Sequence, residues 1–257
     1  MAQWTAFPYA AEYVFDKAGV KKTWARLHVG DAEPLPVDVG VLEAWALFHS
    51  GEFQTAADAG LRAGAGGITV ANKATCIYAN YLEQREKVKL DLFMEVTERA
   101  AAQAAAEPGN ANAHYWQAYA LGRYSQGISV AKALAQGLGG RVRTALETTI
   151  RLQPAHVDAH IALAAFHAEV IDKVGALIGG MTYGARKDTG LKLFQEALRL
   201  NPMSAIGMIE YANGLVMLEG DEKMDEATLL YERAAASVPV DATERLDVEM
   251  ARQELAD

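Results

Sequence analysis

Cysteine is nearly absent from this chain of 257 residues, which contains only Cys76. A single cysteine forms no intrachain disulfide and no cysteine-based metal site, and it fits a reducing compartment. The first residues, MAQWTAFPYAAEYVFDKAG, lack the basic start and continuous apolar core of a secretory signal. The least charged stretch, 174–185, is shorter than the roughly 18–20 apolar residues that span a bilayer. We therefore expect a cytoplasmic protein without a membrane span.

Basic residues are also scarce, since the formal net charge is −9. Residues 219–257 hold twelve acidic and four basic side chains, so the remainder of the chain is nearly neutral. Nucleic-acid binding needs a basic face that displaces counterions, and we expect no nucleic-acid partner. The acidic C-terminal part is interpreted as a solvated helical face, with a docking face for a basic partner as the alternative.

Two copies of one pattern reveal an internal repeat. The segments DTGLKLFQEALRLNP and MDEATLLYERAAASVP share the spacing small–x3–aromatic–x2–Ala–x4–Pro. Their matching residues are Gly190, Phe194, Ala197 and Pro202 in the first copy and Ala227, Tyr231, Ala234 and Pro239 in the second. This pattern is typical of the second helix of a tetratricopeptide-type helical hairpin. Prolines at Pro108 and Pro154 continue the series, with spacings of 46, 48 and 37 residues. A plain repeat has about 34 residues, so two of these units are longer.

The extra length lies between the two helices of the third and fourth hairpins, at 128–142 and 170–185. Each insert begins like a helix and contains a Gly-Gly pair, Gly139-Gly140 in the first and Gly179-Gly180 in the second. Paired glycines end helices and permit positive φ, so we interpret each insert as a lengthened first helix followed by a loop.

Helix boundaries can also be predicted. Asp188 or Thr189 is expected to cap the helix that runs to Leu200, and Asp241 opens an Asp-x-x-Glu capping box for the last helix. Further upstream, the segment from 44 to 63 is expected to be a hairpin that turns at Gly51, followed by two helices over 73–106. No segment shows sustained period-two alternation, which predicts an all-α fold.

The expected fold is a tetratricopeptide-like right-handed superhelix of antiparallel helical hairpins, with extended inserts in two repeats. Residues 1–40 match no repeat and are expected to form an N-terminal cap whose aromatic side chains pack against the first hairpin. Residues 41–239 would form about five hairpins. Residues 240–257 would form the polar-backed capping helix that terminal repeats need.

Residues 111–239 resemble one branch of the tetratricopeptide superfamily. The segments that carry the resemblance are AHYWQAYALG, LETTIRLQPAHVDAHIALAAFHAEV and LKLFQEALRLNP, separated by the two glycine-rich inserts. They are similar to the regulator of microtubule dynamics proteins and to the T-component-like proteins of TRAP transporters. The resemblance implies a helical adaptor or solute-handling scaffold without catalysis.

Partner contacts are expected on the first helix of each hairpin, which lines the concave face of such arrays. In the third unit the predicted contact residues are Tyr115, Trp116, Tyr119 and Arg123. Tyr, Trp and Arg are typical of recognition hot spots, and the alternative is that two of these aromatics fill the hairpin core. In the fifth unit the predicted residues are Glu210, Asn213 and Met217. The Asn213 amide can bind an extended peptide backbone, or it is a helix-surface amide without a partner.

Three histidines and a glycine cluster resemble ligand-binding motifs, but we interpret both as structural. The histidines His156, His160 and His167 have zinc-ligand spacing near one helix face. The first is expected in the turn before the helix and the others inside the hairpin, so no metal and no other cofactor is predicted. The glycine cluster over 60–67 lacks the preceding strand and the Gly-Lys-Ser/Thr of a phosphate loop, and we interpret it as a flexible link.

Three functions remain open at this point. No nucleophile–base or paired-carboxylate arrangement indicates an enzyme, so the leading hypothesis is a non-enzymatic scaffold that binds a peptide or partner protein in its concave groove. The alternative is a small apolar ligand in a cavity walled by the two inserts. The third is self-association through the exposed inserts.

Overall fold

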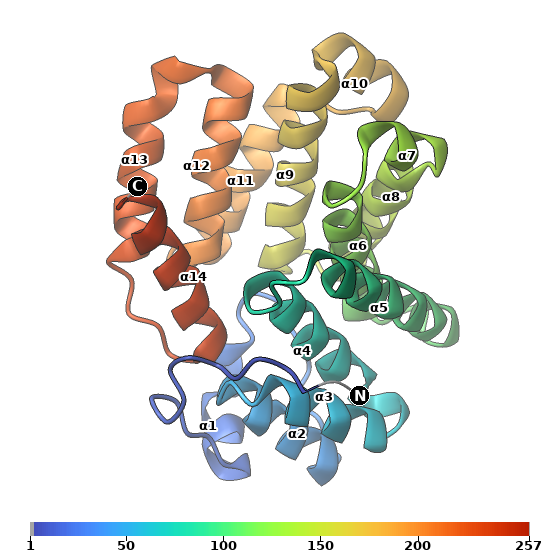
Figure 1. The fold of residues 1–257 in the computed structure, drawn as a ribbon, viewed down its shortest axis with the longest axis vertical. Coiled ribbons are helices and arrows are strands. Elements are labelled where there is room, and N and C mark those ends of the chain that lie inside the picture. Colours follow the sequence, from blue (N-terminus) through green and yellow to red (C-terminus); the bar gives the residue numbers. More distant parts are fainter. Residues whose placement is uncertain (1–2, 257) are drawn as a thin grey trace. The chain divides into compact units, whose positions relative to one another are not determined.

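The computed structural model describes residues 3–256, which form α-helices and two short 3-10 helices but no β-strand (Figure 1). The predicted all-α class is therefore confirmed. The chain divides into two compact units, which are described separately below. The first comprises Met1–His28, Glu33–Gln153 and Val240–Thr243, and the second comprises Val29–Ala32, Pro154–Pro239 and Glu244–Asp257. The main division thus falls inside the range 41–239 that the sequence pattern treats as one array.

The first unit is built from helices that pack on their neighbours in the chain. These are α1 (Lys17–Leu27), α2 (Val39–His49), α3 (Phe53–Arg62), α4 (Ile68–Tyr81), α5 (Glu86–Ala106), α6 (Ala111–Gln126), α7 (Val130–Ala135) and α8 (Leu138–Leu152). In addition, α4 contacts both α2 and α6, so the first helices of successive hairpins lie side by side. Gly51 has a φ of 86° at the predicted turn between α2 and α3.

The second unit contains two helical hairpins and a terminal helix. Its elements are α9 (Val157–Val174), α10 (Ala176–Tyr183), α11 (Lys187–Leu200), α12 (Ala205–Glu219), α13 (Met224–Ala235) and most of α14 (Ala242–Glu254). The α9–α11 pair packs on the α12–α13 pair through α12. Val248 and Ala251 of α14 join the apolar core of α12 and α13, which gives this helix the terminal packing role expected for it.

The repeated residues are the ones that bring the two helices of a hairpin together. Phe194, Ala197 and Ala234 are completely buried, and Ala227 is nearly so. The Phe194 ring packs with Val157, Ile161 and Ala164 of α9 within its own hairpin. It also lies directly on Gly214 of α12 in the next hairpin, where an added Cβ would overlap the ring. The small–aromatic–Ala spacing therefore marks close helix packing, as the sequence predicts.

The interpretation of the two Gly-Gly pairs is wrong. Gly139-Gly140 lies in the first turn of α8, and Gly179-Gly180 lies within α10. Each insert contains an extra short helix, α7 or α10, instead of a loop. The positive φ values fall on other glycines, namely Gly137, Gly175 and Gly184. Gly179 stays helical because it is buried against α9, where an added Cβ would be 3.1 Å from Val170 Cγ1.

Two other local predictions also fail. The helix α11 begins at Lys187 with Arg186 at its N-cap, so Asp188 and Thr189 lie in its first turn. A carboxylate there still interacts favourably with the helix dipole, which explains the misplaced signal. The glycine cluster over 60–67 is not a flexible link, because Gly60 is buried in α3 and an added Cβ at Gly67 would overlap the Gly60 backbone. These glycines permit close contact between chain segments.

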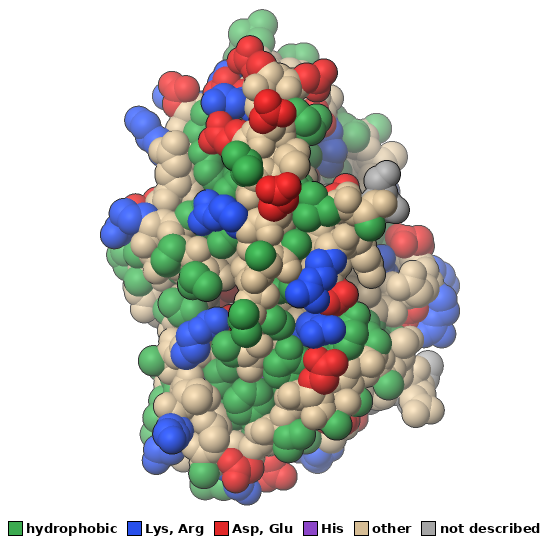
Figure 2. Space-filling model, turned by 90° about the vertical axis from the view of Figure 1, so that its left-hand side faces the viewer, with side chains coloured by type: hydrophobic (Ala, Val, Ile, Leu, Met, Phe, Trp, Pro, Cys, Tyr) green, Lys and Arg blue, Asp and Glu red, His purple; other side chains and the backbone are tan. Residues whose placement is uncertain are grey.

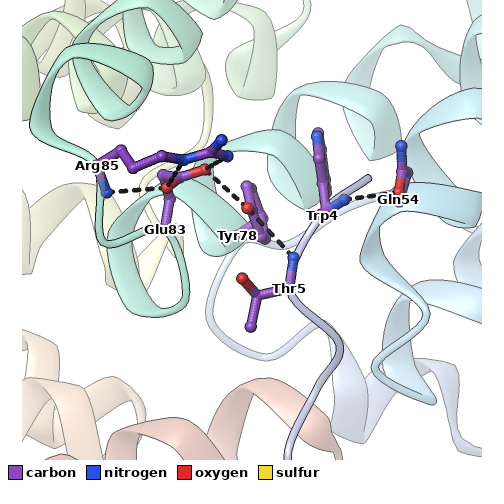
Figure 3. A network of polar contacts seen from close by, with 6 residues as sticks. All are labelled: Trp4, Thr5, Gln54, Tyr78, Glu83 and Arg85. Atoms are coloured by element: carbon purple, nitrogen blue, oxygen red, sulfur yellow. Dashed lines mark hydrogen bonds and ion pairs between the residues drawn. The ribbon is translucent and has the colours of Figure 1, made fainter. Parts of the chain in front are cut away.

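The N-terminal segment packs against the first hairpins, as predicted. Trp4 stacks on Tyr78 with 4.2 Å between ring centroids, and Phe7 contacts Phe53 edge to face. The backbone N–H of Trp4 donates to Gln54 Oε1 at 3.0 Å (Figure 3). Aromatic burial and backbone hydrogen bonds together hold this segment on α3 and α4.

Candidate partner-binding surfaces

The aromatic residues predicted on α6 form one cluster in the first unit. The Trp116 ring centroid lies 5.4 Å from that of Tyr119, and Tyr115 lies 6.0 Å from Tyr119. The Arg123 guanidinium carbon lies 5.3 Å from the Tyr119 ring centroid, at cation–π distance. All four predicted residues are therefore together, in the order imposed by successive helical turns.

The four residues differ in how much of their side-chain surface is exposed. Tyr115 and Trp116 are buried, with 5% and 2% of their surface exposed, so they belong to the core. Tyr119 and Arg123 are half-buried. The sequence alternative, in which two of the aromatics fill the core, is thus the arrangement found. Of the four predicted residues, Tyr119 and Arg123 are the ones with appreciable exposed surface.

A buried lysine of α4 contacts the Trp116 ring of this aromatic cluster. Lys73 of α4 is only 8% exposed. Its Nζ lies 5.2 Å from the Phe48 ring centroid, 5.6 Å from that of Trp45 and 6.0 Å from that of Trp116. The aromatic faces stabilise a cation that has left water. Sequence reasoning missed Lys73, although it is the one charged residue in an otherwise uncharged helix.

The predicted α12 residues lie in the second unit and share a face at i, i+3 and i+7. Glu210 and Asn213 are half-buried, and Met217 is exposed. The Tyr231 hydroxyl of α13 donates to Asn213 Oδ1 at 2.7 Å, so this amide is not the partnerless one that was the alternative. Burial raises the pKa of Tyr231, as do the nearby charges of Glu254 and Glu210.

The face of the second unit near the α12–α13 turn is acidic. Exposed acidic residues there include Asp221, Glu222, Asp225 and Glu226. Figure 2 shows acidic side chains gathered in the upper part of the face it presents, with hydrophobic side chains between them. Leu229 is 59% exposed on α13, one helical turn from Asp225. A solvated face and a surface for a basic partner both fit this composition.

The three histidines of α9 have structural contacts. His156 is the N-cap of α9, and its Nδ1 accepts the Ala159 N–H at 3.1 Å. His167 Nδ1 accepts the Arg186 N–H at 3.2 Å, which holds the start of α11 on α9. All three side chains are buried, in the positions that the sequence predicts for them. No group of metal-ligating side chains is found within residues 3–256.

Buried His28, His49 and Asp241 form a polar network, here called the histidine chain, that links distant parts of the first unit. His49 is fully buried, and its Nδ1 lies 2.6 Å from Asp241 Oδ2. Its Nε2 lies 3.2 Å from Nε2 of His28, whose ring stacks on Trp24. An ionised carboxylate only accepts, so the His49 Nδ1–H donates to Asp241, and one of the two Nε2 atoms donates to the other. These groups satisfy one another inside an aromatic core.

Glu83 anchors a third polar network, shown in Figure 3. Arg85 donates to both of its carboxylate oxygens, from Nε at 2.9 Å and from Nη2 at 2.7 Å. The Tyr78 hydroxyl donates to Glu83 Oε2 at 2.8 Å and accepts the Thr5 N–H at 3.3 Å. The network joins the N-terminal segment to the turn between α4 and α5. The Arg85 hydrogen bonds hold the pKa of Glu83 at about 2, below 4.5, although burial raises it.

This depressed pKa predicts a pH-dependent contribution to stability. The Glu83 carboxylate stabilises the first unit fully above about pH 4.5, and this contribution is lost as the pH falls towards 2. Glu83→Gln should therefore be less stable than the wild type at neutral pH, with the difference shrinking below pH 4.5. Urea unfolding at a series of pH values measures it, with exposed Glu98→Gln as the control. A difference that stays constant with pH would show that the charge of Glu83 contributes nothing.

Comparison of the sequence with known protein-family models and with curated proteins finds no match in either case.

Within residues 3–256, no helix combines the length and the apolar character needed to cross a membrane. The fold defines an all-helical protein, and its function has to be inferred from its surfaces.

Proposed function

We propose that this chain is a non-enzymatic, tetratricopeptide-type adaptor that binds a peptide or partner protein. The observation that carries the proposal is the Tyr119–Arg123 pair, a half-buried cation–π contact supported by buried Trp116 and Lys73. A rigid aromatic ring and an oriented guanidinium provide contact area and directed hydrogen bonds at low cost in side-chain entropy.

The supporting core makes this pair a better recognition element than an isolated surface tyrosine. Tyr119 packs against the rings of both Tyr115 and Trp116, and Arg123 lies over the Tyr119 ring. Side chains that are already ordered lose little conformational freedom when a partner binds. The Glu210, Asn213 and Met217 face of α12 is the proposed contact surface of the second unit.

Capture of a partner from an extract of the native cells tests the proposal. The wild type and three variants, Tyr119→Ala, Arg123→Ala and Tyr124→Ala, are immobilised at equal density, and bound proteins are identified by mass spectrometry. Tyr124 is also half-buried on α6 but lies one position further around the helix, so its variant is the matched control. We expect the same partner with wild type and control, and its loss with the first two variants.

A partner captured equally by all four proteins would overturn the assignment of the Tyr119–Arg123 pair. Circular dichroism melting of each variant, compared with the wild type, separates a lost contact from a lost fold. Met217→Ala, run in parallel, tests the α12 face on its own.

A further inference from the structure

Residues 3–7 lie on the first unit without forming a helix or a strand. Phe7 is buried and Trp4 is half-buried, whereas the other three residues of this segment are exposed. Pro8 follows Phe7, and a residue before proline favours the extended conformation. Two aromatic side chains, three positions apart, therefore anchor a segment whose remaining side chains face solvent. We call residues 3–7 the strap.

Side chains of two helices bind the backbone of the strap. The Trp4 N–H donates to Gln54 Oε1 of α3 at 3.0 Å, and the Thr5 N–H donates to the Tyr78 hydroxyl of α4 at 3.3 Å (Figure 3). When a peptide is recognised in this way, its main-chain hydrogen bonds contribute affinity and pockets for its side chains give specificity. Another segment with the same anchor residues can make the same bonds.

The Tyr78 hydroxyl is oriented by residues outside the strap. It donates to Glu83 Oε2 at 2.8 Å, and Arg85 donates to both oxygens of that carboxylate. Because the Arg85 hydrogen bonds hold the pKa of Glu83 at about 2, the carboxylate is ionised at neutral pH and only accepts. The hydroxyl proton is thus used by Glu83, and the lone pairs of the Tyr78 oxygen remain for an N–H donor.

Two places on the helices receive aromatic rings. The Trp4 ring stacks on Tyr78, with 4.2 Å between ring centroids and 10° between ring planes. The Phe7 ring lies edge to face against Phe53, with 6.0 Å between centroids, and also contacts Gly51. A Cβ added at Gly51 would overlap the Phe7 ring, so the glycine at this turn makes room for it. Together these places select aromatic side chains that are separated by two residues.

We propose that the surface under the strap is a binding site for an extended segment of a partner protein with aromatic residues at its first and fourth positions. The strap occupies this site within its own chain, and the partner segment displaces it. The first ring of the partner stacks on Tyr78, the next N–H donates to the Tyr78 hydroxyl, and the second ring packs on Gly51. The site shares no residue with the Tyr119–Arg123 pair, so the inference does not depend on the proposed function.

The strap can leave this surface without disrupting a helix. It precedes α1, which begins at Lys17, and the hydrogen bonds drawn in Figure 3 tie it to side chains. Segments near a chain end open locally at a low cost in free energy. A segment on the same chain competes at an effective concentration in the millimolar range, so a free peptide binds the wild type weakly. Weakening the strap should raise the affinity for the peptide.

Fluorescence anisotropy with a labelled synthetic peptide of residues 3–10 tests this proposal. The receptors are the full-length wild type, Trp4→Ala and the double variant Trp4→Ala/Phe7→Ala. We expect the double variant to bind the peptide at least about tenfold more tightly than the wild type, with Trp4→Ala between them. Thr5→Ala is the matched control, because it changes an exposed side chain of the strap and keeps the backbone N–H. It should bind the peptide like the wild type.

Two altered peptides test the chemistry of the site. A peptide that is N-methylated at its threonine lacks the donor for Tyr78 and should bind the double variant about fivefold more weakly. A peptide with alanine in place of its tryptophan and phenylalanine should lose at least about a hundredfold in affinity. Circular dichroism melting shows whether each receptor is folded. If the double variant is unfolded, the comparison of Trp4→Ala with the wild type decides.

Absence of peptide binding to the folded variants, or equal binding by the wild type and the weakened variants, overturns the proposal. Equal affinity for the native and the alanine-substituted peptide overturns it as well. Sedimentation of the wild type at several concentrations distinguishes the remaining occupant. A dimer that the double variant no longer forms would assign the site to the strap of a second copy instead of a partner protein.

Discussion

Trp116→Ala should lower the free energy of unfolding by about 3–5 kcal/mol, which is the usual cost of removing a large aromatic side chain from a core. Trp116 is 2% exposed, contacts Tyr115 and Tyr119, and covers the ammonium of Lys73. The substitution leaves a cavity and removes one of the rings that stabilise a buried cation. Urea denaturation followed by circular dichroism measures the change.

Trp116→Phe is the informative companion variant. It keeps an aromatic face near Lys73, and it loses no hydrogen bond because Trp116 Nε1 has no partner among residues 3–256. We expect a smaller loss of about 1–2 kcal/mol. If both variants unfold like the wild type, Trp116 is not a core residue. It would then be available for the partner contact that the sequence pattern predicts.

The second large loss of stability is expected on replacement of Asp241, the buried carboxylate that accepts from His49. Asp241→Ala removes the acceptor of the His49 Nδ1–H and leaves that donor buried without a partner, at a cost of about 2–4 kcal/mol. Asp241→Asn retains an acceptor oxygen but not the charge, so its loss should be about half as large. Equilibrium denaturation of the wild type and both variants gives the comparison.

Exposed Asp225→Ala is the control for this series and should change stability by less than about 0.5 kcal/mol. Equal stabilities for Asp241→Ala and Asp225→Ala would contradict a structural role for the histidine chain. The ring proton of His49 offers a second observable, since its NMR signal should move when Asp241 is replaced.

Much of the fold follows from local sequence signals. The Gly51 turn, the prolines after the helix ends and the small–aromatic–Ala spacing each depend on residues within one hairpin. The prediction of loops at the two Gly-Gly pairs was wrong, because a glycine pair disfavours a helix only where no tertiary contact compensates. In α10, contact with Val170 of the preceding helix makes the absence of a side chain favourable and keeps Gly179 helical.

The candidate sites were predictable only in part. The Tyr115–Arg123 segment was found because its residues lie on successive turns of one helix. Burial of Trp116 depends on α4, whose Lys73 lies over its ring, and the segment itself does not encode this contact. The contact between His49 and Asp241 joins residues 192 positions apart, so no periodicity signals it. Asp241 was expected only as a helix cap, and α14 does begin at the next residue.

The central claim is that Tyr119 and Arg123 bind a partner, and calorimetric titration with the captured partner's binding segment tests it most directly. The account predicts that Tyr119→Ala and Arg123→Ala each raise the Kd about thirtyfold, the effect of losing a hot-spot residue. Tyr124→Ala should stay within about threefold of the wild type. Equal dissociation constants for all four folded proteins would contradict the proposed binding surface.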